Sequence, residues 1–181
     1  TSVTVPEGIS NIEKGTFRNC NSLTSVTLPE SITSIGANAF YSCASLTSIE
    51  LPKGVKSIGE YAFAFCDSLT SVTLPEGVTS VADGMFSGCV KLASVTLAKG
   101  TTSIGESAFN SCNNLTSLAF LENVTSVGDY AFAYCDGLVN AVIPEGITDI
   151  ADGMFAGCVN LTSVTFNDQV IRIGSNAFAD C

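Results

Sequence analysis

Apolar residues recur along this chain at a fixed interval of 23 positions. Four columns keep the interval in phase over the whole length, which chance does not plausibly produce, so the chain is built from internal repeats. The columns are Cys20, Cys43, Cys66, Cys89, Cys112, Cys135, Cys158 and Cys181; Phe17, Phe40, Phe63, Phe86, Phe109, Phe132, Phe155 and Phe178; Leu23, Leu46, Leu69, Leu92, Leu115, Leu138 and Leu161; and Ile12, Ile35, Ile58, Val81, Ile104, Val127, Ile150 and Ile173.

The third copy, residues 46–68, shows the pattern within one unit. Its segment 46–51 alternates apolar residues with Thr or Ser, which predicts a short strand with one buried face. Pro52 ends this strand because it has no N–H for a ladder bond, and a second short extended piece covers 55–58. The segment 60–66 places its apolar residues at helical spacing, which predicts a brief helical segment.

A more specific signature follows the strand pattern. Leu-x-x-Ile/Val-x-Leu and the unit length resemble leucine-rich repeats. The continuation resembles the BspA-like, or Treponema-type, class of these repeats, in essentially the whole chain, and reads here Leu51-Pro52…Ile58-Gly59-Glu60-Tyr61-Ala62-Phe63-Ala64-Phe65-Cys66. This resemblance implies a secreted or cell-surface protein, in a class of which several members adhere to host proteins such as fibronectin and fibrinogen.

One unit cannot bury its own apolar side, whereas stacked copies can, at about 4.8 Å per rung. We therefore predict an α/β solenoid: a right-handed leucine-rich-repeat arc of eight 23-residue repeats, with short parallel strands on one face and short helical or 3-10 segments on the other. A single domain over 1–181 is expected, as a fragment of a longer protein that is uncapped at both ends.

Some units depart from the pattern, and we expect each departure to loosen one turn. Ala98, Leu121 and Asn167 replace the strand-ending Pro, Thr101 replaces an apolar residue at the turn, and Glu13, Ala82 and Ala151 replace the Gly of the Ile-Gly pair. Residues 59–92 and 128–161 are also closely similar, at an offset of three repeats. This second period indicates duplication of a three-repeat block.

Composition narrows the function. The net charge is −10, from 17 acids and 7 bases, which argues against nucleic acid and anionic membranes as partners. No segment has the roughly 18 consecutive apolar residues that cross a bilayer. Histidine is absent, and no phosphate-binding or dinucleotide-binding glycine motif occurs. We predict no catalytic activity, no cofactor and no metal.

The cysteines have two interpretations. Eight in a secreted chain allow a disulfide framework. Stacking favours buried free thiols instead, because side chains one rung apart point in parallel and do not meet disulfide geometry. Disulfides between adjacent rungs remain the alternative.

An acidic column also has two interpretations: Glu60, Asp83, Glu106, Asp129 and Asp152. Stacked carboxylates supply the oxygen ligands that Ca²⁺ takes. The preferred explanation is structural, with each acid in the first turn of a helical segment, where the macrodipole favours negative charge.

The outward positions of the strand face are the candidate partner-binding residues. Thr and Ser there also suit a solvated strand. Two rungs carry apolar residues instead and predict an exposed apolar patch. The candidates are Thr27, Glu50, Thr73, Thr96, Ala119, Leu121, Val139, Val142 and Thr165. The expected function is a non-catalytic protein-interaction module that binds an extracellular, host protein through this face; the alternative is a structural spacer or stalk with no ligand of its own.

Overall fold

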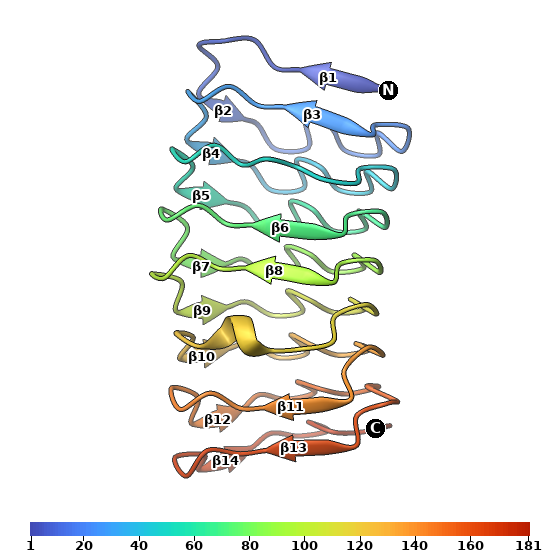
Figure 1. Ribbon diagram of the computed structural model, residues 1–181, viewed down its shortest axis with the longest axis vertical. Coiled ribbons are helices and arrows are strands. Elements are labelled where there is room, and N and C mark those ends of the chain that lie inside the picture. The colour runs from blue at the N-terminus through green and yellow to red at the C-terminus, as the bar shows by residue number, and fades with distance from the viewer.

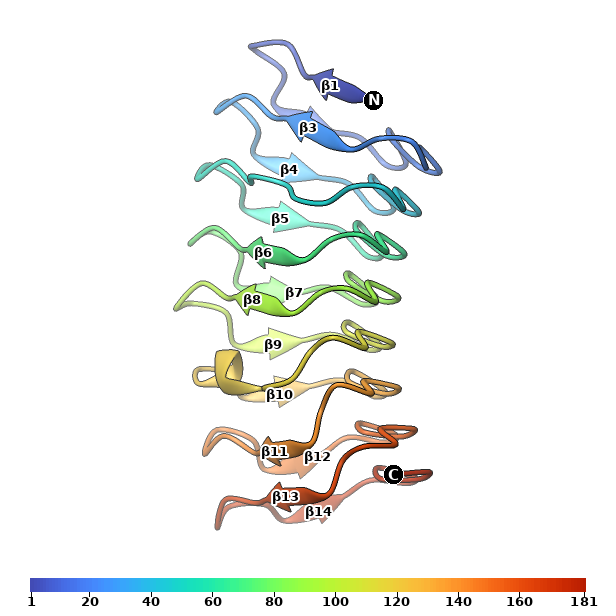
Figure 2. The ribbon, with the colours of Figure 1, turned by 45° about the vertical axis from the view of Figure 1, so that its right-hand side comes forward.

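The computed structural model describes residues 1–181, except for the side chain of Phe120. The chain forms a parallel β-solenoid of about seven turns, stacked along its longest axis (Figure 1). It therefore does not confirm eight complete repeats. The strands form two layers that run in opposite directions, as Figure 2 shows.

The front layer is made of three-residue strands whose central residue faces inward and is buried, except in the first and the last, where Val3 and Val164 are half-buried. Each pairs in parallel with the equivalent strand 23 residues away, as in Ser71↔Ser94 and Thr73↔Thr96. The front strands are β1 (Ser2–Thr4), β3 (Ser25–Thr27), β6 (Ser71–Thr73), β8 (Ser94–Thr96), β11 (Asn140–Val142) and β13 (Ser163–Thr165).

The back layer consists of two-residue strands, which lie in the second short extended piece predicted at 55–58 and in its equivalents in the other units. Each ends on the Ile/Val column, which faces the core. The back strands are β2 (Asn11–Ile12), β4 (Ser34–Ile35), β5 (Ser57–Ile58), β7 (Ser80–Val81), β9 (Ser103–Ile104), β10 (Ser126–Val127), β12 (Asp149–Ile150) and β14 (Arg172–Ile173). Within the described part of the chain, the single helical element is the 3-10 helix η1 (Ala119–Leu121).

The prediction of a helical segment at 60–66 is wrong, and the backbone hydrogen bonds explain why. Tyr61, Phe63 and Phe65 donate their N–H groups to carbonyls of the next rung, at 2.9, 3.0 and 2.7 Å. The intervening residues Ala62 and Ala64 donate to carbonyls three residues back. A helix directs every N–H to the carbonyl four residues back. Alternate donors are therefore used to join rungs, and the α/β description is replaced by an all-strand and turn architecture.

Ladders of identical residues fill the interior. The Phe rings stack from rung to rung with centroids 5.1–6.0 Å apart and interplanar angles of 2–17°. Phe40, Phe63, Phe86, Phe109, Phe132 and Phe155 are fully buried. Burial at about 1.5–3 kcal/mol per side chain makes this ladder a principal source of stability.

Two seams interrupt the back layer, between β5 and β7 and between β10 and β12. Both fall where the Ile-Gly pair has lost its glycine, at Ala82 and Ala151. At Gly59, a Cβ would lie 2.5 Å from the backbone nitrogen of Ala37 in the preceding rung. A rung that carries this Cβ must lie farther from the preceding rung, so the back strands of the two rungs do not pair.

Packing at the seams agrees with this explanation. The Phe63–Phe86 and Phe132–Phe155 centroids, which span the seams, are the most separated in the ladder, at 5.7 and 6.0 Å. Met85 replaces a column alanine three residues after Ala82, and it is fully buried. Its longer side chain suits the wider spacing between the two rungs at this seam. Glu13 opens no seam, because no rung precedes it in this chain.

Candidate protein-interaction surface

The front face presents eight of the nine predicted partner-binding positions to solvent. In the front strands the residues on both sides of the central one point outward, as Ser25 and Thr27 do in β3. The exposed candidates are Thr27, Glu50, Thr73, Thr96, Ala119, Val139, Val142 and Thr165.

Leu121 is the exception, and its placement on the exposed patch is wrong. Its side chain is 0% exposed and belongs to the core. The position is equivalent to Pro52 and Ala98, which are also buried, so this column faces inward. The 3-10 turn, closed by the Leu121 N–H on the Leu118 carbonyl at 3.0 Å, directs the backbone there without a strand.

Val139 and Val142 are exposed apolar side chains in polar columns. Val142 is 65% exposed and occupies the column of Thr73 and Thr96. Val139 is 47% exposed and replaces a threonine whose hydroxyl elsewhere donates to the preceding rung, as Thr162 does to the Val139 carbonyl at 3.1 Å. Val139 therefore lacks the hydroxyl that joins two rungs at Thr162, and Val142 replaces an outward polar side chain with an apolar one.

An open groove adjoins Val142, where η1 replaces a front strand. One cavity of about 630 Å³ lies between the η1 rung and the β11 rung, and a second of about 540 Å³ lies on the β8 side. Both share Ala119, Glu122 and Asn123. The first is also lined by Ser117, Leu118, Asn140, Val142, Pro144 and Glu145.

Sequence reasoning missed most of this groove. The sequence differs here, since residues 119–123 read Ala-Phe-Leu-Glu-Asn where residues 73–77 read Thr-Leu-Pro-Glu-Gly. Loss of the proline and the glycine does not by itself remove a front strand, because β13 forms although Asn167 and Gln169 occupy the same two positions. The exposed Glu122 and Asn123 then form the rim that both cavities share.

The acidic column is structural in a different way from that expected. Because these acids lie in turns, and η1 is the one helix among the described residues and does not contain them, the macrodipole explanation is wrong. Asp83 Oδ1 accepts the Glu106 N–H at 2.8 Å, and Asp129 Oδ1 accepts the Asp152 N–H at 3.0 Å, so each carboxylate joins two rungs. Among the described residues, no three His, Cys, Asp or Glu side chains are grouped to hold a metal ion.

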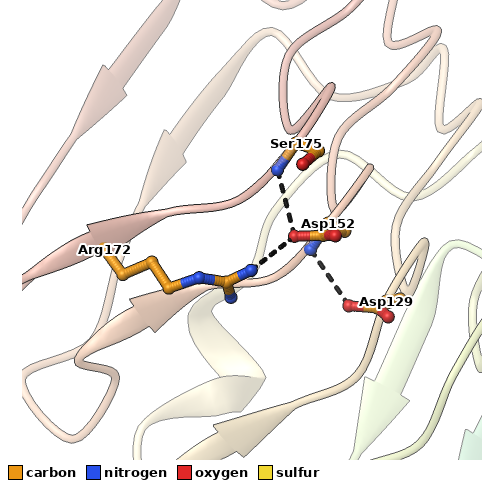
Figure 3. A network of polar contacts seen from close by, with 4 residues as sticks. All are labelled: Asp129, Asp152, Arg172 and Ser175. Atoms are coloured by element: carbon orange, nitrogen blue, oxygen red, sulfur yellow. Dashed lines mark hydrogen bonds and ion pairs between the residues drawn. The ribbon is translucent and has the colours of Figure 1, made fainter.

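At its C-terminal end the acidic column also forms an ion pair with an arginine. Figure 3 shows Asp152 Oδ1 accepting from the Arg172 guanidinium at 2.7 Å and from the Ser175 N–H at 3.0 Å. Gly174 permits this arrangement, since a Cβ there would lie 2.3 Å from the same oxygen.

All eight cysteines are free thiols. Each thiol from Cys43 onward donates to the carbonyl of the phenylalanine 26 residues earlier, as Cys89 Sγ does to Phe63 O at 3.1 Å. The thiols therefore bind across rungs without covalent links. Burial raises the pKa of Cys43 to about 11 and that of Cys89 to about 12.

We expect two fast and six slow thiols in a thiol-reagent titration of the native 181-residue chain at pH 8. Cys20 and Cys181 are exposed, whereas the other six are buried and held neutral. Denaturation should release all eight. Eight fast thiols in the native chain, or fewer than eight after denaturation without reductant, would contradict the thiol ladder.

Stability should also fall in alkali. The pKa of the Cys89 thiol is raised in the folded chain from its ordinary 9.0, so its contribution is complete below pH 9 and is lost as the pH rises toward 12. The free energy of unfolding, followed by urea titration at each pH, should decline over this window. A Cys89→Ala chain should decline less steeply, by up to about 1.4 kcal/mol per pH unit; equal slopes would argue against the buried thiol.

The sequence matches the model of the BspA-type leucine-rich repeat region over residues 1–104 and 56–181, in six copies. The chain belongs to this BspA-type leucine-rich repeat family. Proteins of this kind are general scaffolds for protein interaction, and the family's repeat proteins are generally non-enzymatic. No protein of curated function matches the sequence.

Solved structures of leucine-rich repeat proteins share the fold. A leucine-rich repeat protein from Treponema pallidum is 28% identical with a TM-score of 0.60, covering 96% of this chain and 72% of that one. One from Bacteroides ovatus is 26% identical with a TM-score of 0.59, covering 100% and 64%. A leucine-rich cell surface protein from Faecalibacterium prausnitzii is 28% identical with a TM-score of 0.51, covering 99% and 73%.

The BspA-type chain thus spans about two thirds to three quarters of each of these proteins. In the part of the chain that the structure describes, no helix has the length and apolar character needed to cross a membrane.

Proposed function

We propose that this BspA-type repeat chain is a non-catalytic interaction module of a cell-surface or secreted protein, one domain of a longer chain, that adheres to or recognises an extracellular host protein through its front face. The observation that supports this proposal most directly is the groove at η1, which is open on both sides and is flanked by Val142 at 65% exposure. Exposed apolar residues beside a polar rim are typical of protein-binding surfaces.

The location is supported by the comparison with the Faecalibacterium prausnitzii protein, which is named a leucine-rich cell surface protein. Host adhesion is supported by the resemblance to adhesive members of the same repeat class. The high share of Thr and Ser on the remaining front rungs gives adaptable hydrogen-bonding groups around the groove.

Binding to immobilised fibronectin and fibrinogen tests the proposal, with Val142→Asp and Val142→Thr as the variant pair. Aspartate places a charge in the apolar patch, and we expect it to weaken binding at least tenfold. Threonine restores the column residue and removes only the apolar tip, so its loss should be smaller, with unchanged melting temperature in both variants.

Equal binding by wild type and Val142→Asp would remove the groove as the binding site. Uniform absence of binding to matrix proteins would favour the alternative, a spacer without its own ligand.

A further inference from the structure

A second surface lies on the edge formed by the turns that follow the back strands, away from the front face. Two aromatic pairs are exposed there, Tyr61 with Phe65 and Tyr130 with Tyr134, three rungs apart. All four residues have positive φ, between 53° and 58°. Bulky residues rarely adopt this conformation, because it brings Cβ against the following carbonyl.

Each of these aromatic rings covers a glycine of the next rung. A Cβ on Gly84 would lie 2.1 Å from the Tyr61 ring, and a Cβ on Gly153 would lie 2.2 Å from the Tyr130 ring. The rings pack closely on these glycines. This packing holds each ring in place at its seam and leaves it 39–55% exposed. The edge therefore presents positioned aromatic surfaces to a partner.

Carboxylates accompany the aromatic rings. Glu60 precedes Tyr61 and Asp129 precedes Tyr130, and the acidic column continues through the rungs between them. Among the described residues, Asp152 with Arg172 is the one ion pair. The exposed Glu60, Asp83, Glu106 and Asp129 are thus left without a basic side chain.

The chain itself shows which group fits this edge. Arg172, on β14, reaches back 20 residues to Asp152. Arg18 lies over the Tyr41 ring of the same edge, with its guanidinium carbon 4.8 Å from the ring centroid. One guanidinium thus pairs with a carboxylate and another lies over an aromatic ring, at opposite ends of the solenoid.

Repeat geometry extends the Arg172 arrangement to earlier rungs. The residue 20 positions after Asp83 is Ser103, and the residue 20 positions after Glu106 is Ser126. Ser126 and Ser103 are register partners on adjacent back strands, as Arg172 and Asp149 are. Where the last rung has its own arginine, the rungs of Asp83 and Glu106 have small serines, which leave the space beside these two carboxylates open to a side chain from outside. The equivalent residue for Asp129 is Asp149, which adds a further carboxylate at that rung.

We propose that this edge binds an arginine-bearing segment of a partner protein, with guanidinium groups on Asp83, Glu106 and Asp129 and over the flanking tyrosines. Net charge of −10 favours approach of such a segment. Arginine fits better than lysine because its planar fork pairs with carboxylates in two contacts and stacks on aromatic faces. This surface is separate from the front-face groove and does not depend on the function proposed for it.

Fluorescence anisotropy with labelled octa-arginine and octa-lysine peptides tests the proposal on the 181-residue chain. Asp83→Asn/Glu106→Gln/Asp129→Asn is the edge variant, in which asparagine keeps an oxygen for the backbone N–H. Glu7→Gln/Glu30→Gln/Glu76→Gln, on exposed turns that follow the front strands β1, β3 and β6, changes the net charge equally and is the matched control. We expect wild type and control to bind octa-arginine at low salt, and the edge variant to bind at least tenfold more weakly.

Two further variants separate the roles of the groups. Ser103→Arg places a guanidinium relative to Asp83 as Arg172 stands to Asp152, and it should weaken peptide binding by occupying the site. Tyr130→Gly keeps the positive φ and should reduce the preference for octa-arginine over octa-lysine. Equal loss in the edge and control variants, or no loss in the edge variant, would overturn the proposal.

Discussion

Phe109→Ala should lower the free energy of unfolding by about 3–5 kcal/mol, the largest effect expected of a single substitution in this chain. The Phe109 ring is fully buried and stacks on Phe86 and Phe132, with both centroids 5.5 Å away. Removal of the ring leaves a cavity and interrupts the ladder in the middle of the solenoid. Domains of this size have about 5–15 kcal/mol of stability, so the variant should be partly or wholly unfolded.

The effect should depend on position in the ladder. Phe17 is only partly buried and has one stacked neighbour, at 5.1 Å, because it lies in the first rung. Phe17→Ala should therefore cost clearly less than Phe109→Ala in urea or thermal unfolding. Equal costs at the two positions would contradict a ladder in which each ring is held by both neighbouring rungs.

Gly59→Ala should destabilise the chain by about 1–3 kcal/mol, although it adds one methyl group. That Cβ would lie 2.5 Å from Ala37 N, and moving the rung away would break the bond from Gly59 N to Ile35 O, which is 2.8 Å long. Gly100→Ala is the matched control. A Cβ there meets only a Thr79 methyl at 3.8 Å, so this change should be neutral or stabilising by about 0.4–1 kcal/mol.

The natural seams suggest how Gly59→Ala is compensated. Ala82 and Ala151 are each followed three residues later by a buried methionine, Met85 and Met154. Gly59→Ala/Ala62→Met should consequently lose less stability than the sum of the two single changes, in a double-mutant cycle. A cycle with no favourable coupling would mean that seam and methionine are unrelated.

The stacking of the rungs could be predicted almost completely from the sequence. Columns of Phe, Leu, Ile and Cys placed the core, since identical residues at one interval can meet only if the coils lie in register. The resemblance in Leu51-Pro52…Cys66 identified the family that the comparison confirms. The looser turns at Ala82 and Ala151 were also expected, because both positions depart from glycine.

Local backbone conformation was less accessible. Ala62, Phe63 and Cys66 have helical spacing, and they are buried as expected, yet the segment is a series of turns. Periodicity reports which side chains face inward; it does not report whether an N–H bonds within the turn or to the next rung. The expected strand at 46–51 is likewise absent, although 25–27 and 71–73 form it.

The candidate surface was predicted in part. Strand alternation correctly predicted exposed front positions such as Val142. The predicted exposure of Leu121 is wrong, because its column faces the core. The sequence shows that residues 119–123 lack the proline and glycine of residues 73–77, but it does not show that a 3-10 helix replaces the strand there and leaves a groove. Single-residue substitutions are visible in a sequence, but the change of element that several cause together is not.

A crystal structure of the 181-residue chain tests the central claim most directly, through the distances between phenylalanine rings. Our account predicts one continuous stack, with neighbouring centroids 5.1–6.0 Å apart and the widest steps at Phe63–Phe86 and Phe132–Phe155. Rings of Phe40 and Phe63 in separate parts of the molecule, or a helix over residues 60–66, would contradict it.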